Sequence, residues 1–308
     1  MGGRLLDDVA TKQACHREPA GDSVGRGTAY GTFGELLQGV LFENGLDFLV
    51  TLPIAQFSTA IFHARADDDE VRVVPGPKAK SRLLAERILR AYAPRVGGLL
   101  QLSSTLPVGK GFASSSADLV ATARAVADAL GIVIDERTLE DFLRDIEPSD
   151  GVMYSGVVAY YHREVRLRER LGFLPPLLIV GHDEGGMVST IEFNRRPKSL
   201  TDADKREYDD LLRTLTRAVR EVDLPTLGAV ATRSTEKNAK LLPRNHLADL
   251  KRICATAGGL GVVAAHSGTM LGILFADDED GAAAARKARE LCQQLPGTVS
   301  VHRSLGSA

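Results

Sequence analysis

The chain has 308 residues, of which 44% are hydrophobic and 25% are charged, and its formal net charge is −2 at pH 7. These values are typical of a globular protein long enough for two domains, and they give no support to nucleic-acid or anionic-membrane binding. Apolar runs of membrane-spanning length and a signal-peptide core are not found, so a cytoplasmic protein is expected. Cys15, Cys254 and Cys292 lack metal-ligand spacing and are expected to be reduced thiols.

The first 26 residues are polar and show no hydrophobic periodicity, so a mobile extension is predicted over residues 1–26. Ordered structure is expected from Gly27 onward. Two strands are predicted at 40–42 and 48–52, paired around the turn Asn44-Gly45. A second pair, at 57–64 and 70–74, is predicted to form a hairpin around the acidic turn 67–69.

A glycine- and serine-rich stretch follows a helix predicted at 78–92 and a strand predicted at 99–103. It starts at Pro107, contains two glycines and a lysine, and ends in three consecutive serines, Ser114 to Ser116. The next residues form a helix, because apolar side chains recur at spacings of four, three and four up to Leu130. Gly131 is a typical residue to end that helix.

Such a loop before a helix favours anion binding, because backbone N–H groups and the positive end of the helix dipole converge there. Lys110 adds a positive charge suited to a phosphate. An ordinary loop with serine caps is the alternative interpretation. The stretch does not contain the G-x-x-x-x-G-K-[ST] pattern of a Walker loop.

The rest of the chain alternates helices and strands. The charged stretch 163–170, followed by Pro175-Pro176, is the best predicted domain boundary. The alternation after it suits a ferredoxin-like α+β half. Helices are predicted at 136–146, 204–222, 225–237, 246–257 and 282–295, and strands or extended chain at 157–161, 177–180, 190–194, 262–265, 270–275 and 298–302.

The stretch 107–117, PVGKGFASSSA, resembles the P-x-x-x-G-L-G-S-S-A-A phosphate loop of the GHMP kinases, with Phe112 in place of leucine and Ala113 in place of glycine. Three more stretches are similar to the branch that contains the L-threonine kinases of cobalamin synthesis and propanediol utilisation. They are GTFGELLQG at 31–39, IEPSDGVMY at 146–154 and AHSGTMLG at 265–272. All four occur in the family's order.

This resemblance implies an α+β fold with two domains. Residues 27–172 would form an ATP-binding domain like domain 2 of ribosomal protein S5, and residues 173–308 a ferredoxin-like domain. It also implies a kinase that transfers phosphate from ATP, with Mg²⁺, to a small-molecule hydroxyl, most plausibly that of L-threonine. The expected partner is a small-molecule substrate, a hydroxy amino acid, and neither nucleic acid nor a membrane. The chain is expected to be a monomer or a homodimer.

Site residues carried over from the family motifs fall into three groups. The ATP phosphates would be held by the loop, namely Pro107, Gly109, Lys110, Gly111, Phe112, Ala113, Ser114, Ser115 and Ser116. Mg²⁺ would be held by Ser115 together with Glu147 or Glu140, a choice that the sequence leaves open. The acceptor would contact Glu35, Gln38, Asp150, Ser267, Gly268 and Thr269, with Asp150 and Lys110 as the catalytic residues.

Several alternatives stay open. Asp150 precedes a glycine, which is also ordinary turn chemistry, and His266 is interpreted as a structural residue rather than a base. Ala29 stands where most GHMP kinases carry a lysine, so a mechanism that needs this lysine is not expected. A kinase of another small hydroxyl compound and a non-catalytic nucleotide or metabolite sensor are the competing functions.

Overall fold

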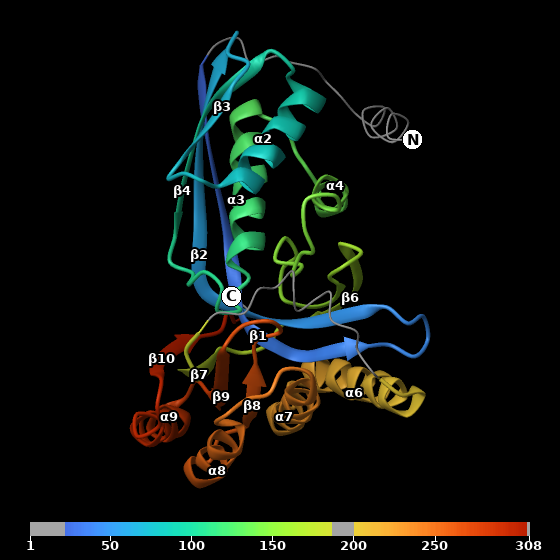
Figure 1. The fold of residues 1–308 in the computed structure, drawn as a ribbon, viewed down its shortest axis with the longest axis vertical. Helices are drawn as coiled ribbons and strands as arrows, with labels where there is room; N and C mark the ends of the chain where they lie inside the picture. The colour runs from blue at the N-terminus through green and yellow to red at the C-terminus, as the bar shows by residue number, and fades with distance from the viewer. Residues whose placement is uncertain (1–21, 187–199, 307–308) are drawn as a thin grey trace.

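A long two-stranded antiparallel ribbon runs from the top of the molecule to its middle, where it bends to the right above α6 and α7 (Figure 1). The structure is a computed structural model that describes residues 22–186 and 200–306. The ribbon consists of β1 (Ser23–Val40) and β2 (Asp47–Ala66), and Val40 pairs with Asp47 beside the predicted turn. The predicted extension lies outside the described residues up to residue 21, whereas Ser23 to Arg26 already belong to β1.

The upper half in Figure 1 is built on β1, β2 and two further strands. There β4 (Val96–Ser104) pairs with β2, and β3 (Val71–Val74) pairs in parallel with β4. The predicted hairpin between 57–64 and 70–74 is therefore wrong. The helix α2 (Ala79–Tyr92) provides the crossover that a parallel pair needs. Alternating β-forming residues indicated the strands but carried no information on their partners.

One helix lies directly against the ribbon and carries the glycine- and serine-rich stretch at its start. It is α3 (Ser114–Leu130), which ends at Gly131 as predicted. A Cβ atom built on Gly27 would lie 2.2 Å from the Ala121 carbonyl oxygen of α3. Glycine and alanine thus let helix and strand backbones meet closely, which holds the start of α3 in a defined place.

The chain after α3 first returns to the ribbon. It forms α4 (Glu136–Leu143), β5 (Val157–Tyr161), which pairs with β2, and β6 (Arg166–Gly172), which pairs with β5. The stretch that was predicted as a domain boundary thus contains a strand. Its alternating charged residues suit a strand with one solvated face. The division at residue 172 stays a prediction.

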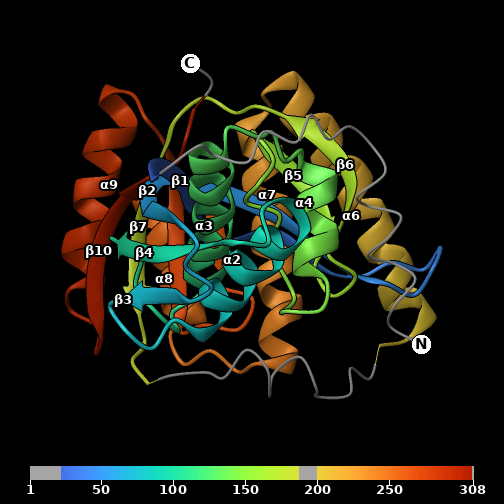
Figure 2. The same ribbon diagram turned by 90° about the horizontal axis from the view of Figure 1, so that it is seen from above.

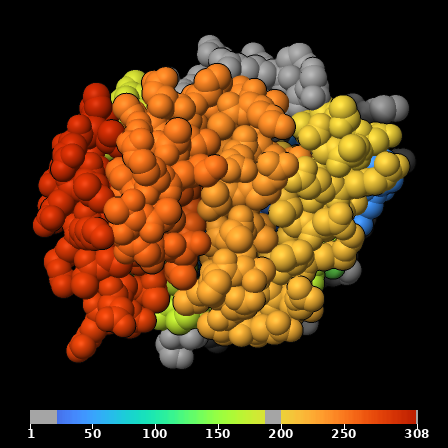
Figure 3. All heavy atoms as spheres, turned by 90° about the horizontal axis from the view of Figure 1, so that it is seen from below, coloured from blue at the N-terminus to red at the C-terminus, as the bar shows by residue number. Residues whose placement is uncertain are grey.

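The lower half contains the remaining strands with helices over one face. Seen from below, these helices form a continuous layer (Figure 3). The sheet order is β10-β7-β9-β8-β1-β2-β4-β3, and β8 meets β1 only at the pair Ala264 and Glu35. The elements are β7 (Leu177–Asp183), α6 (Asp202–Glu221), α7 (Leu224–Leu241), α8 (Leu247–Ala257), β8 (Gly261–Ala264), β9 (Met270–Ala276), α9 (Glu279–Cys292) and β10 (Thr298–Arg303).

The mixture of helices and antiparallel strands confirms the predicted α+β class. Viewed from above, α3 lies beside the strands of the ribbon, with α2 and α4 near it (Figure 2). The predicted extended stretch 190–194 lies outside the described residues. Within the described residues, no helix is both long and apolar enough to cross a membrane. Cys254 and Cys292 are free and buried, as expected for reduced thiols.

Candidate active site

The start of α3 has the backbone of an anion site. Gly109 and Gly111 have φ angles of 73° and 92°, and Ala113, at the N-cap, has φ 54°, a left-handed conformation that is unusual for alanine. The side chain of Ala113 cannot cap the helix, and the first turn holds no acidic residue. The first N–H groups of α3 therefore have no side-chain cap to compete with an incoming phosphate.

A second loop, residues 265–269, supports the glycine-rich loop by close backbone packing. A Cβ atom on Gly268 would lie 2.0 Å from the Lys110 carbonyl oxygen, and one on Gly111 would lie 2.2 Å from the Cβ of Ala265. Ser267 and Thr269 flank Gly268 and are both largely buried. The structure thus brings together two of the predicted motifs, which are about 155 residues apart in the sequence.

Phe112 anchors the glycine-rich loop rather than facing a ligand with its ring. Its side chain is buried, and its ring centroid lies 5.4 Å from that of Phe33. Its carbonyl oxygen accepts a hydrogen bond of 3.1 Å from the Thr32 amide of β1. The aromatic ring therefore fixes the loop against the ribbon, and its part in phosphate binding is limited to the backbone.

Two carboxylates meet the first turn of α3 at successive serines. The Ser115 hydroxyl donates to Oε1 of Glu147 at 2.5 Å, and the Ser116 hydroxyl donates to Oδ2 of Asp150 at 3.1 Å. Both carboxylates lie in the turn that follows α4, with Pro148 between them in the sequence. The structure therefore brings together the two serines, Glu147 and Asp150.

Glu140, the other candidate for the metal, is occupied elsewhere. Its Oε1 accepts hydrogen bonds from the Tyr154 hydroxyl at 2.8 Å and from the Leu167 amide at 2.7 Å. Burial raises the pKa of this carboxyl group. These contacts hold α4 against the following segments, so Glu147 is the carboxylate that the geometry offers to Ser115.

Glu35, which is buried, and Asp150, which is partly buried, place two acidic side chains near the glycine-rich loop. Burial raises the pKa of Asp150 to about 6, and the charge of Glu147 acts in the same direction. Burial also raises the pKa of Glu35 well above its ordinary value, and the Asp150 charge adds to this shift. Among the described atoms, Oε2 of Glu35 has no hydrogen-bond partner. A free oxygen on a buried carboxyl group suits a cationic or hydrogen-bonding ligand.

The side chain of Gln38 makes hydrogen bonds that connect neighbouring elements of the fold. Its Oε1 accepts from Asn238 Nδ2 at 2.9 Å and lies 2.7 Å from His266 Nδ1, while its Nε2 donates to the Ala264 carbonyl at 3.4 Å. The side-chain amide thus joins β1 to α7 and the 265–269 loop. The interpretation of His266 as a structural residue fits this arrangement, whereas contact between substrate and Gln38 stays a prediction.

Lys110 points away from the start of α3, toward the lower half. Its ammonium group pairs with Asp183 Oδ2 at 2.8 Å and donates to the Gly186 carbonyl at 2.8 Å. Thr269 joins the same cluster, because its hydroxyl donates to Asp183 Oδ1 at 2.5 Å. A phosphate would have to compete with these contacts for the lysine.

Two lysines near the site gave no signal in the sequence. Lys78 pairs with Asp118 in the second turn of α3 at 2.7 Å, and Lys80 pairs with Glu147. Both lie at the start of α2, a position that sequence patterns cannot place next to α3. Ala29, at the position where most GHMP kinases carry a lysine, is buried in β1.

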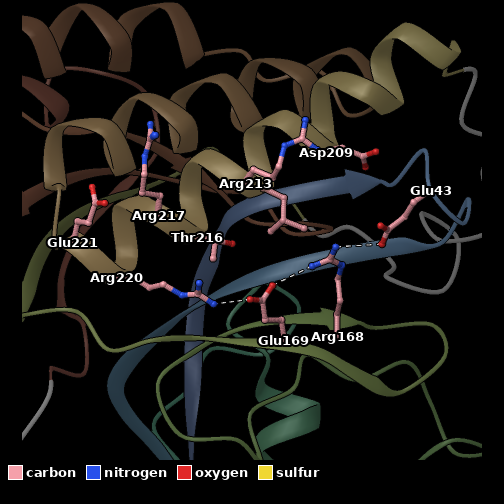
Figure 4. A pocket seen from close by; sticks show the side chains of 10 residues that line it. Glu43, Arg168, Glu169, Asp209, Arg213, Thr216, Arg217, Arg220 and Glu221 are labelled. Atoms are coloured by element: carbon pink, nitrogen blue, oxygen red, sulfur yellow. Dashed lines mark hydrogen bonds and ion pairs between the residues drawn. The ribbon is translucent and has the colours of Figure 1, made fainter.

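A cavity of about 460 Å³ lies between β6 and α6 (Figure 4). Its charged lining is largely paired, for example Arg168 with Glu43 and Arg220 with Glu169. None of the predicted site residues lines it. We therefore assign the candidate site to the start of α3.

Comparisons with known proteins agree with this assignment. Residues 80–160 match the family of GHMP kinase N-terminal domains. The chain is 27% identical over 260 residues to the L-threonine kinase of Salmonella typhimurium, covering 83% of this chain and 84% of the relative.

Solved structures share the fold at low identity. The homoserine kinase from Cytophaga hutchinsonii is 17% identical with a TM-score of 0.71, over 96% of each chain. MDDEF in complex with MVAPP, AMPPCP and magnesium is 16% identical with a TM-score of 0.68, over 92% of this chain and 98% of that one. The family match includes the start of α3, Glu147 and Asp150, and these similarities support an ATP-dependent phosphotransferase that acts on an alcohol group.

Proposed function

We propose that this protein phosphorylates the hydroxyl group of L-threonine with ATP. The observation that carries the proposal is the presentation of Glu147 and Asp150 on two successive serines at an uncapped helix start. Phosphoryl transfer needs positioning and charge neutralisation rather than covalent catalysis. A phosphate-holding turn with one carboxylate for a metal and another for the acceptor meets both needs.

Magnesium fits the residues present. Mg²⁺ prefers oxygen ligands and is commonly bound by one or two carboxylates together with substrate phosphates. Ser115 and Glu147 would hold it, and no group of three or more acidic, histidine or cysteine ligands occurs among the described residues. Mg²⁺ held by Ser115 and Glu147 would supply positive charge that neutralises the charge of the phosphate oxygens.

The acceptor would lie beside Asp150 and Glu35. The Asp150 carboxylate would orient the acceptor hydroxyl and take up its proton, and a pKa of about 6 leaves it ionised at neutral pH. The unpartnered oxygen of Glu35 would pair with the α-ammonium group of an amino acid. Because the buried Glu35 carboxyl group has an oxygen that could accept a cation, it supports a zwitterionic substrate over a neutral sugar. A role in cobalamin synthesis and a cytoplasmic location stay predictions from the family resemblance.

The experiment is an ATP turnover assay with threonine, serine and valine. Threonine is expected to be phosphorylated on oxygen, and valine to be inert because it lacks the hydroxyl. Serine should react more slowly, since losing one methyl contact costs about 1–3 kcal/mol, or roughly 10–200-fold. Transfer to a sugar or an isoprenoid alcohol, with none to the amino acids, would contradict the assignment of L-threonine as the substrate. Absence of any turnover would favour a non-catalytic sensor.

Lys110 is expected to contribute to ATP binding after leaving Asp183. Lys110→Ala should raise the KM for ATP with little change in kcat, because a charge-assisted contact of about 1.5–3 kcal/mol is lost. Asp183→Asn should lower that KM, since the lysine no longer has to be withdrawn from a carboxylate. Steady-state ATP titrations of both variants test this. If both variants raise the KM, Lys110 only braces the loop.

A further inference from the structure

Lys80 makes a contact that is explained neither by packing nor by the roles already proposed. It lies in the first turn of α2, and its ammonium group pairs with Oε2 of Glu147. The other oxygen of the same carboxylate, Oε1, accepts the hydrogen bond from Ser115. The Glu147 carboxylate therefore bridges the Lys80 ammonium group and the Ser115 hydroxyl at the start of α3.

This lysine is not needed to build α2. Its side chain is 47% exposed, and the helix is held in place by other residues that are buried, among them Leu84 and Ile88. The ammonium end of the ion pair is open to solvent, whereas the Glu147 side chain is only 11% exposed. The start of a helix also disfavours a positive charge, and the first turn of α2 holds no acidic residue to compensate. The pair with Glu147 is thus easily exchanged.

A second cation at Glu147 would compete with this lysine. A carboxylate shared by a divalent ion and an ammonium group binds each less strongly than it would bind either alone, because the two positive charges repel. The lysine side chain is a flexible four-carbon stem, so its charged end can move while α2 stays in place. A triphosphate at the uncapped start of α3 would offer that end a new anionic partner.

We infer that Lys80 is a nucleotide-binding residue, held on Glu147 when no nucleotide is bound and transferred to the triphosphate when the metal–nucleotide complex enters. The inference rests on the proposed function of the same site. In the nucleotide-free protein the ammonium group occupies one oxygen of Glu147 as a stand-in for the metal cation. In the complex the same charge neutralises phosphate oxygens.

The inference predicts opposite changes in two binding constants of Lys80→Met. Without nucleotide, the variant should bind Mn²⁺ several-fold more tightly than the wild type, because the competing ammonium group is gone. With Mg²⁺ present, it should bind a non-hydrolysable ATP analogue roughly ten-fold more weakly, because a charge-assisted phosphate contact is lost. Electron paramagnetic resonance of free Mn²⁺ and calorimetric titration of the analogue measure the two constants.

Two variants serve as controls. Lys80→Arg retains the charge and should stay within a few-fold of the wild type in both constants. Arg82→Met removes an exposed charge two residues along α2 that pairs only with Glu86, at 3.6 Å, among the described residues, and should change neither constant. Melting temperatures of all variants should match that of the wild type, since the replaced side chains are exposed.

The outcomes separate this inference from the proposed function. An unchanged analogue affinity in Lys80→Met, with normal binding by the wild type, overturns the role of Lys80 and leaves the kinase proposal intact. Weaker Mn²⁺ binding in Lys80→Met also overturns it, because the lysine would then position Glu147 for the metal. A wild type that binds no nucleotide overturns both.

Discussion

Asp150→Asn is expected to lower kcat by about 10²- to 10⁴-fold, the usual contribution of a positioned acid or base. The KM for ATP should change little, because Asp150 contacts Ser116 and not Ser115 or Glu147, the pair proposed to hold the metal. An isosteric amide can still accept the Ser116 hydrogen bond, so the turn is preserved. Steady-state kinetics with threonine and ATP varied separately measure both constants.

The pH dependence gives an independent check. With a pKa of about 6 for Asp150, kcat/KM of the wild type should rise as the pH increases through 6 and level off above it. The Asp150→Asn variant should lack this rise of kcat/KM with pH. A wild-type profile that is flat between pH 5 and 7 would contradict a role for the ionised carboxylate.

Loss of folding cannot mimic this result, because the stability effect has the opposite sign. Burial raises the pKa of Asp150 in the folded chain, so its contribution to stability is present below the ordinary aspartate range and is lost as the pH rises through 6. At pH 8 the wild type carries the cost of a partly buried charge, which asparagine removes. The melting temperature of Asp150→Asn at pH 8 should therefore equal or exceed that of the wild type.

Gly268→Ala is expected to reduce kcat/KM by about 100-fold or more. The new Cβ atom would lie 2.0 Å from the Lys110 carbonyl oxygen and 2.6 Å from the Gly111 amide nitrogen, so the glycine-rich loop must move. A displacement of about 1 Å in a positioning element is enough for such a loss. The clash should also lower stability by about 1–3 kcal/mol.

Gly258→Ala is the matched control for a glycine that is important to the fold but not to the site. Gly258 follows α8 with φ 79°, and a Cβ atom there would meet nothing within 4 Å. This change should cost about 1 kcal/mol through backbone strain and leave kcat/KM unchanged. Wild-type activity in Gly268→Ala would mean that the two loops do not hold each other in place.

Long-range contacts decided the details that sequence reasoning left open or missed. Glu140 and Glu147 were equal candidates, because both lie on one short segment after the glycine-rich loop. The fold turns Glu140 toward Tyr154 and Leu167, and Glu147 toward Ser115. Strand 70–74 was placed against the wrong neighbour for a similar reason, since β-forming residues do not specify which strand they pair with.

The sequence by itself determined the elements whose causes are local. The glycines of the loop, the serines and the periodic apolar residues of α3 act within one or two helix turns, so their pattern predicts a loop, a helix start and an anion site. Only the tertiary structure decided which charges meet there. Lys80 with Glu147 and Lys110 with Asp183 join residues 67 and 73 positions apart, and such pairs depend on how whole elements pack rather than on neighbouring residues.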